Sequence, residues 1–321
     1  YELTKNDPIK ITYRKPEAVS ESIAPQFSEY VRQILQKKAE TYGYDLYRDG
    51  LKVYTTIDTR FQKAGEKAIT EQLRGFQKSF NNYWKWSSNS KILADAIDRS
   101  IKYSEEYKNA KSEEQRKKIS DSMRKRESFI DSIKVQTLSV QVAFVCLDPR
   151  TGEIKAMVGA NPDMRYKYGL NRVSQMKRQP GSSFKPFVYA DAINKGYSPG
   201  YMVSNDPIRG NMGGTIWSPK GGGTGGMISM RLGLTKSINV IAVRTAMELA
   251  PIDEVIPLAH DMGIKSELPN FLSLALGSGE VTPLEMTNAY ATFANDGIWV
   301  EPIAIKRIED RHGNLIEEFL P

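Results

Sequence analysis

The sequence has few of the residues on which many enzymes rely. Its 321 residues include one cysteine, Cys146, and two histidines, His260 and His312. A single cysteine excludes a disulfide within the chain, and the apolar neighbours in VAFVCLDP predict a buried small side chain. Two histidines disfavour a Ser-His-Asp triad and a histidine-rich metal site. We therefore expect no metal and no cofactor, and an activated serine would have to use a lysine.

Long apolar runs and phosphate-binding loops are also missing. No stretch approaches the roughly 18 uncharged apolar residues of a membrane span, and the first residues show no signal-peptide pattern. The glycine-rich stretch RGNMGGTIWSPKGGGTGG lacks the G-x-x-x-x-G-K-S/T pattern. We expect a soluble chain, with a flexible loop at residues 209–226 that does not bind phosphate.

The charge is moderately basic, with 45 Lys and Arg against 38 Asp and Glu, a net of +7. The charges are interspersed and show no aromatic-basic recognition motif, so we expect no nucleic-acid partner. An anionic surface such as a membrane or a cell wall is as consistent with this charge. The 40% of hydrophobic residues and the length predict two domains, or one large domain with an insertion.

The first half of the chain changes character at about residue 80. Helical spacing of apolar residues begins near Phe27, a strand is predicted over residues 51–57, and a helix carrying Phe61, Ala68 and Leu73 opens near Asp58. Residues 80–135 are dense in mixed charge, with a thin apolar stripe at Ile119, Met123 and Ile130. Mixed charge on a helix is usually a solvated face, so this segment is predicted to form the exposed helices of an insertion.

The second half alternates strands and helices. Residues 148–152 predict the turn of a hairpin, and residues 227–250 show helical spacing. Pro251 suits a first helical position, Thr282 and Glu285 form a capping box, and Gly297 is a stop signal. A last hairpin is predicted around residues 312–314.

The string RQPGSSFKPF places a serine and a lysine in one helical turn. Pro186 is tolerated only in the first turn, so the helix must begin about three or four residues earlier, near Ser182. Lys185 then shares a face with Ser182, whereas Ser183 points elsewhere. The helix dipole and any burial favour neutral lysine, which can activate a serine. An S-x-x-K is also typical of a serine cap beside a solvated lysine, and both interpretations stay open here.

A second short motif follows in chain order. Ser237-Ile238-Asn239 is an S-x-N between two helical segments. Alone, such a motif is also typical of loop residues that bond their own backbone. Lys236 just before it is interpreted as a solvated helix end without a role.

Taken together, S-x-x-K and S-x-N are part of the signature of penicillin-binding proteins and class A β-lactamases. With RQPGSSFKPF, LTKSINVIAVRT and LALGSGEVTPLEMTNAYATFANDG around them, the sequence resembles the transpeptidase domain of a class A penicillin-binding protein. The string GYDLYRDGLKVYTTIDTRFQ resembles the segment that joins the glycosyltransferase and transpeptidase parts of such enzymes. The resemblance covers residues 26–75 and 138–321.

This resemblance implies a fold and a domain division. The fold class is α/β (α+β), a penicillin-binding-protein and serine β-lactamase-like fold with helices on both sides of an antiparallel sheet. Four segments are expected: a linker lead at 1–25, a linker-proximal part at 26–79, a charged helical insertion at 80–137, and the transpeptidase domain at 138–321. The resemblance also implies a longer parent protein, of which this chain is a part. That parent protein is expected to be anchored on the extracytoplasmic side of the cytoplasmic membrane.

The resemblance also implies roles for four residues. Ser182 would attack the penultimate D-Ala of a D-Ala-D-Ala stem peptide and Lys185 would take its proton. Ser237 would relay a proton to the leaving D-Ala, and Asn239 would bond the substrate amide and hold Lys185. The exposed backbone N–H of Ser182 suits one oxyanion-hole donor. Peptidoglycan stem peptides and β-lactam antibiotics are the expected partners.

The third motif of the signature is absent. No Lys-Thr-Gly or Lys-Ser-Gly occurs in the sequence, so we expect a fold incomplete at its C-terminus. A segment bearing Lys-Thr-Gly and a glycosyltransferase domain of the parent are then further expected partners. Alternatives are a D,D-carboxypeptidase or β-lactamase-like hydrolase, and a non-catalytic scaffold for wall assembly.

Overall fold

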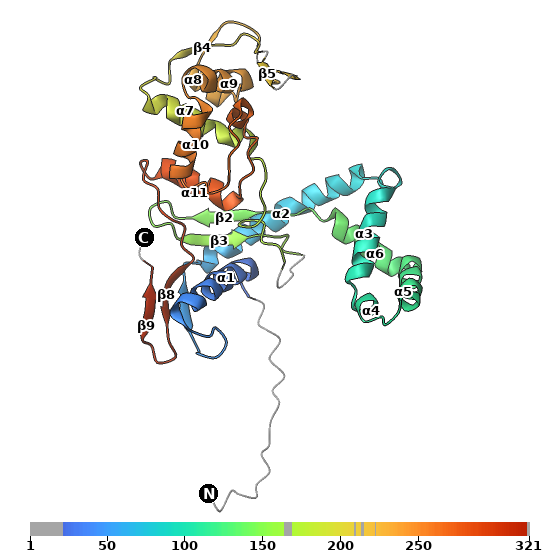
Figure 1. The fold of residues 1–321 in the computed structure, drawn as a ribbon. Coiled ribbons are helices and arrows are strands. Elements are labelled where there is room, and N and C mark those ends of the chain that lie inside the picture. The colour runs from blue at the N-terminus through green and yellow to red at the C-terminus, as the bar shows by residue number, and fades with distance from the viewer. Residues whose placement is uncertain (1–21, 164–168, 209, 213–214, 222, 320–321) are drawn as a thin grey trace, which may run out of the picture.

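The computed structural model describes residues 22–163, 169–208, 210–212, 215–221 and 223–319. A layer of helices (α7 to α11) lies above the strand pair β2–β3, and α1 lies below it with a small sheet (Figure 1). A helical arm projects to one side. Most of the expected linker lead, residues 1–25, lies outside the described residues. The mixed architecture confirms the predicted α/β (α+β) class.

The lower part joins residues near the two ends of the chain. Helix α1 (Pro25–Tyr42) buries Phe27, Val31 and Leu35, as the apolar spacing predicts. Beside it lies an antiparallel sheet of β1 (Lys52–Thr55), β8 (Ile305–Glu309) and β9 (Leu315–Glu318), in the order β1-β8-β9. The predicted strand after residue 50 and the last hairpin are both confirmed.

The central strand pair is the hairpin predicted around residues 148–152. Strands β2 (Phe144–Leu147) and β3 (Ile154–Val158) pair antiparallel. All four residues of β2 are half-buried, so Cys146 is less buried than the sequence predicts. The reason is that β2 pairs only with β3 among the described residues, which leaves its other edge uncovered there. Helix α11 contacts β2 from one side, and α1 and α2 contact β3 from the other.

Helix α2 (Thr59–Tyr83) begins as predicted, with Asp58 as its N-cap accepting from the backbone N–H of Arg60. Its buried face, however, consists of Gln62, Gly65 and Ile69. Phe61, one of the apolar residues from which the helix was predicted, is 50% exposed. At Gly65 the helix backbone lies directly against the side chain of Phe144 in β2. A Cβ at residue 65 would lie 2.8 Å from the Phe144 ring.

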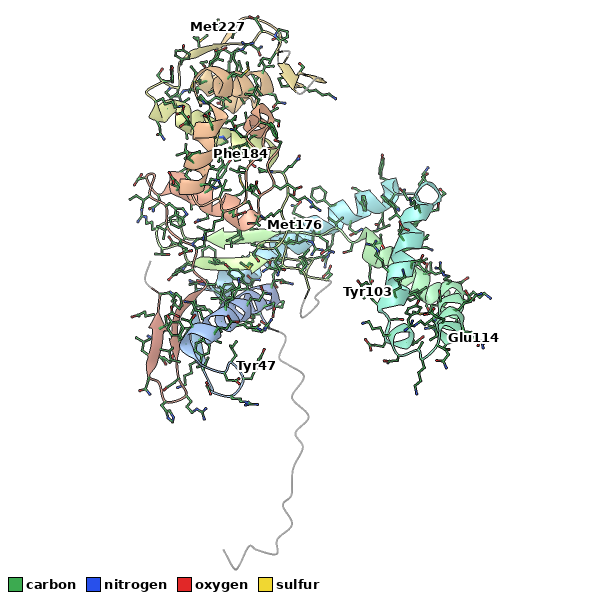
Figure 2. All side chains as sticks on the ribbon, in the orientation of Figure 1. Tyr47, Tyr103, Glu114, Met176, Phe184 and Met227 are labelled. Carbon is green, nitrogen blue, oxygen red and sulfur yellow. The ribbon has the colours of Figure 1, made fainter. Side chains whose placement is uncertain are left out.

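The charged segment forms the arm, which is helical as its spacing predicts. It consists of η1 (Trp86–Ser88), α3 (Ser90–Tyr103), α4 (Glu105–Lys108), α5 (Glu113–Lys125) and α6 (Glu127–Leu138). It has a small core of its own, made by Ala96, Ile97, Ile101, Met123 and Ile133. Tyr103 and Glu114 lie on the arm, away from the helical layer that holds Phe184 (Figure 2).

The helical layer contains most of the buried apolar residues. Its elements are η2 (Gly181–Phe184), α7 (Lys185–Asn194), β4 (Met202–Ser204), β5 (Gly210–Met212), β6 (Thr215–Trp217), β7 (Met227–Ser229), α8 (Met230–Thr235), α9 (Asn239–Glu248), α10 (Ile252–Asp261), η3 (Leu272–Leu276) and α11 (Pro283–Ala294). The expected loop at 209–226 contains the paired strands β5 and β6, and residues 209, 213–214 and 222 of it lie outside the described residues.

Three details of this layer correct or confirm the predictions. Residues 227–229 are a strand paired with β4 and not helix, because the extended chain there bonds a neighbouring strand before α8 begins. Pro251 is the N-cap of α10 and precedes its first position. The capping box of Thr282 and Glu285 is present at the start of α11. Among the described residues, no helix is long and apolar enough to cross a membrane.

Candidate active site

The turn that carries Ser182 is a short 3₁₀ segment, η2, that runs directly into α7. Pro186 falls in the first turn of α7, where its missing N–H costs nothing. Ser182 and Ser183 are exposed, whereas Phe184, Lys185 and Phe187 are fully buried. Figure 2 shows Phe184 within the helical layer. The turn therefore presents a serine to solvent and sends the following lysine inward.

Lys185 is the centre of the site. Its side chain is 0% exposed, and its Nζ donates to Ser237 O at 2.7 Å, to Ser237 Oγ at 2.9 Å and to Asn239 Oδ1 at 2.6 Å. All three acceptors are uncharged groups. Burial lowers the pKa of Lys185, because desolvation disfavours the ammonium form. Burial therefore makes the neutral amine easier to reach than in a solvated lysine. In that form Nζ has two N–H donors and one lone pair, so one of its three contacts, that with Ser237 Oγ, can run from the hydroxyl to the amine.

The four predicted site residues come together in two ways. Lys185, Ser237 and Asn239 are joined by direct hydrogen bonds. Ser182 shares the helical turn with Lys185, but among the described residues the Ser182 hydroxyl has no hydrogen-bond partner. Its role as nucleophile and the roles of its three neighbours therefore remain predictions that this geometry supports.

The S-x-N segment is held in an unusual backbone conformation. Ser237 has a φ of 52°, in the left-handed region that serine seldom adopts. The turn between α8 and α9 is closed by bonds from Ser237 N to Leu234 O and from Ile238 N to Gly233 O. Such a conformation costs of order 1–3 kcal/mol and persists where surrounding contacts impose it. Here it directs both the carbonyl and the hydroxyl of Ser237 at Nζ of Lys185.

A glycine-rich loop supports Asn239 from the other side. Asn239 Nδ2 donates to the carbonyl of Lys220 at 2.5 Å, and Asn239 N donates to the carbonyl of Gly221 at 3.2 Å. Gly221 has a φ of 85°. Sequence reasoning assigned this loop no part in the site. The only signal was its glycine content, which allows such backbone positions but does not specify which carbonyl meets which side chain.

A second loop lies directly against the Ser182 turn. Gly181 N donates to Gly277 O at 3.2 Å, and both glycines have positive φ. A Cβ on Gly277 would lie 2.1 Å from Gly181 O. Only glycine allows this approach at residue 277. The loop therefore fixes the chain one residue before Ser182.

The described residues contain no group of three or more His, Cys, Asp or Glu side chains that could hold a metal ion.

Comparison with known proteins identifies the family of the chain. Residues 142–318, more than half of the chain, match the family described as "Penicillin binding protein transpeptidase domain". The chain is 32% identical to penicillin-binding protein 1A of Neisseria lactamica, over 92% of this chain and 42% of that protein. It is 28% identical to penicillin-binding protein 1A of Vibrio cholerae, over 98% of this chain and 45% of that protein. The chain thus spans less than half the length of these relatives.

Solved structures show the same fold. The crystal structure of penicillin-binding protein 1A from Haemophilus influenzae is similar with a TM-score of 0.66 at 24% identity, covering 92% of this chain and 50% of that one. The PonA1 protein from Mycobacterium tuberculosis, solved in complex with penicillin V, is similar with a TM-score of 0.59 at 21% identity, covering 92% and 65%. On the family match and this fold, the chain belongs to the penicillin-binding protein transpeptidase family.

Proposed function

We propose that this chain carries the acyl-transfer site of a peptidoglycan D,D-transpeptidase that works through a serine acyl-enzyme. The observation that carries the proposal is the fully buried Lys185, which has a lowered pKa and bonds both Ser237 and Asn239. Ser182 lies exposed one turn away. A buried amine beside an exposed hydroxyl is an arrangement suited to activating that hydroxyl.

The first half-reaction forms the acyl-enzyme. Ser182 Oγ attacks the carbonyl of the penultimate D-Ala of a stem peptide, and its proton passes to neutral Lys185. The C–N bond to the last D-Ala then breaks, and the proton returns to the leaving amine through the hydroxyl of Ser237. An amine of a neighbouring stem peptide next attacks the ester carbonyl and gives a proton to neutral Lys185. That proton passes to Ser182 Oγ as the ester C–O bond breaks, which frees Ser182 and leaves a new peptide bond between the two stems.

Asn239 has one amide hydrogen left for a substrate. Its Oδ1 is bonded by Lys185 and one N–H of its Nδ2 by Lys220 O. A side-chain amide has two N–H donors. The second donor suits the substrate amide, while the first keeps the side chain in place.

The developing oxyanion needs donors as well. The backbone N–H of Ser182, at the start of a helical turn, suits one of them. No Lys-Thr-Gly or Lys-Ser-Gly occurs in this sequence. We therefore infer that a segment bearing that motif supplies the second donor and the contacts to the substrate carboxylate.

The remaining partners follow from the same proposal. β-Lactams would acylate Ser182, and PonA1, which shares the fold, was solved with penicillin V. The site would act outside the cytoplasmic membrane, on a protein that also carries a glycosyltransferase domain. This placement rests on the likeness to penicillin-binding protein 1A.

Product analysis tests the proposal. The longest natural form of the protein is incubated with a D-Ala-D-Ala stem peptide and an acceptor amine, beside Ser182→Ala and the neighbouring control Ser183→Ala. We expect cross-linked dimer from the native protein and Ser183→Ala, and none from Ser182→Ala. Free D-Ala without dimer would instead support the hydrolase alternative, and no product from any variant would support the scaffold.

A further inference from the structure

The chain on either side of Ser182 is held by one segment, residues 272–294. One residue before Ser182, Gly181 N donates to Gly277 O. One residue after it, Ser183 O accepts a hydrogen bond of 2.6 Å from the hydroxyl of Tyr290 on α11. The exposed serine is thus bracketed by two contacts that join positions about a hundred residues apart in the sequence.

The ring of Tyr290 is held in place by packing. Its centroid lies 6.0 Å from that of Phe187 and 5.9 Å from that of Phe293, both in edge-on geometry. Helix α11 is itself anchored at its start, where Glu285 accepts from Thr282 N at 2.7 Å. Two aromatic contacts and an anchored helix leave the hydroxyl little freedom.

The hydroxyl is a donor at neutral pH. Burial raises the pKa of Tyr290 above its ordinary value, so the phenol keeps its proton. The distance of 2.6 Å is within the range of a good O–H to O hydrogen bond. A carbonyl oxygen has two lone pairs, so Ser183 O can accept this bond without giving up an intrahelical one.

Packing alone does not account for the hydroxyl. Phe293, one turn away on the same helix, contacts the same Phe187 ring without one. The side chain of Tyr290 is 39% exposed, so it is not simply core filling. What the hydroxyl adds is a fixed position for the peptide group between Ser183 and Phe184, one residue beyond Ser182.

We propose that Tyr290 is a positioning residue for the nucleophile. Its hydroxyl fixes the Ser183 carbonyl, and through it the direction of the Ser182 side chain, before substrate binds. The inference rests on the proposed function, because it concerns the reactivity of Ser182. A small misplacement of a nucleophile slows the covalent step and leaves initial binding nearly unchanged.

The test compares Tyr290→Phe with Tyr197→Phe. Phenylalanine keeps the ring of Tyr290 and removes only its hydroxyl. Tyr197 lies in the same layer and packs edge-on against Tyr201, and its hydroxyl bonds no described residue. In the longest natural form of the protein, the non-covalent dissociation constant and the acylation rate constant for benzylpenicillin are measured separately. We expect Tyr290→Phe to lower the acylation rate constant about tenfold with an unchanged dissociation constant. Tyr197→Phe should leave both unchanged.

Hydrogen exchange of the amides at residues 182–185 reports the contact independently of acylation. It should become faster in Tyr290→Phe and stay unchanged in Tyr197→Phe, at equal melting temperatures. Native acylation and exchange rates in Tyr290→Phe would overturn this inference and leave the proposed function standing. A native protein that benzylpenicillin never labels at Ser182 would overturn the proposed function, and this inference with it.

Discussion

Helix α2 carries two regions of different construction, and two glutamines show the difference. Near its start, Gln62 bonds the N–H and the C=O of Met157 in β3, at 2.9 and 3.2 Å. Four turns later, Gln77 bonds Val140 N at 2.8 Å and Leu138 O at 2.9 Å. These two residues lie where the chain leaves the last helix of the arm, α6. Each glutamine bonds one backbone N–H and one backbone C=O, but Gln62 is 0% exposed and Gln77 is half-buried.

The degree of burial indicates which parts of the structure tolerate substitution. Around the site, Phe184, Lys185 and Phe187 are fully buried and belong to a layer with a large apolar core. The arm has five buried side chains around which four helices pack. Removing the partner of a polar group near the site should therefore lower the free energy of unfolding more than the same change in the arm. In the arm, water can replace the lost partner.

Replacing Lys185 should have the largest effect. Lys185→Met keeps the length of the side chain and removes the proton acceptor. We expect acylation by benzylpenicillin to slow about 10²- to 10⁴-fold, the usual contribution of a general base. Lys117→Met, an exposed position on the arm, should acylate at the native rate. Equal acylation rates in Lys185→Met and Lys117→Met would show that Lys185 has no special part in acylation.

The two glutamines should differ in stability. Gln62→Ala leaves two buried backbone groups without partners, which we expect to lower the free energy of unfolding by about 3 kcal/mol. Gln77→Ala exposes its partners to water and should cost about 1 kcal/mol. Urea denaturation of both variants measures the difference, and equal losses would show that burial does not separate the two regions.

Asn239→Asp tests whether the charge beside Lys185 sets the pKa of that lysine. Burial lowers the pKa of Lys185, and a carboxylate at residue 239 would raise it by favouring the ammonium form. At neutral pH less neutral lysine remains, so acylation should be about tenfold slower, and recover as the pH rises. The rising limb of the pH–rate profile should move to higher pH. A limb at its native position would contradict this account of Lys185.

Removing the arm should have the smallest effect on the site. Gln77 bonds Leu138 O, so the arm returns beside the helix from which it departs. Replacing residues 82–137 with a short Gly-Ser linker should leave the acylation rate within about twofold of native, since loop length alone changes closure entropy little. A large loss of acylation would show that the arm supports the site.

Much of the fold could be predicted from local pattern. The capping box at Thr282, the N-cap at Asp58 and the hairpin turns depend on a few adjacent residues, so the sequence alone indicates them. The buried face of α2 could not be predicted in this way. It consists of Gln62 and Gly65, whose burial depends on the edge of β3 and on the Phe144 ring, and these lie far away in the chain.

The same limit applies to the site. The spacing of Ser182 and Lys185 within one turn, and the S-x-N at Ser237 and Asn239, were visible in the sequence. The carbonyl groups of Lys220 and Gly277, and the hydroxyl of Tyr290, were not, because each acts through tertiary contacts that no local pattern specifies.

The central claim is that Ser182 is a nucleophile activated by Lys185. The most direct measurement is the intact mass of the protein after incubation with benzylpenicillin, with Ser182→Ala and Ser183→Ala beside it. This is done for the present chain and for its longest natural form. The account predicts an added mass of one benzylpenicillin on the native protein and on Ser183→Ala, and none on Ser182→Ala. An adduct that persists in Ser182→Ala, or a folded full protein that is never labelled, would contradict it.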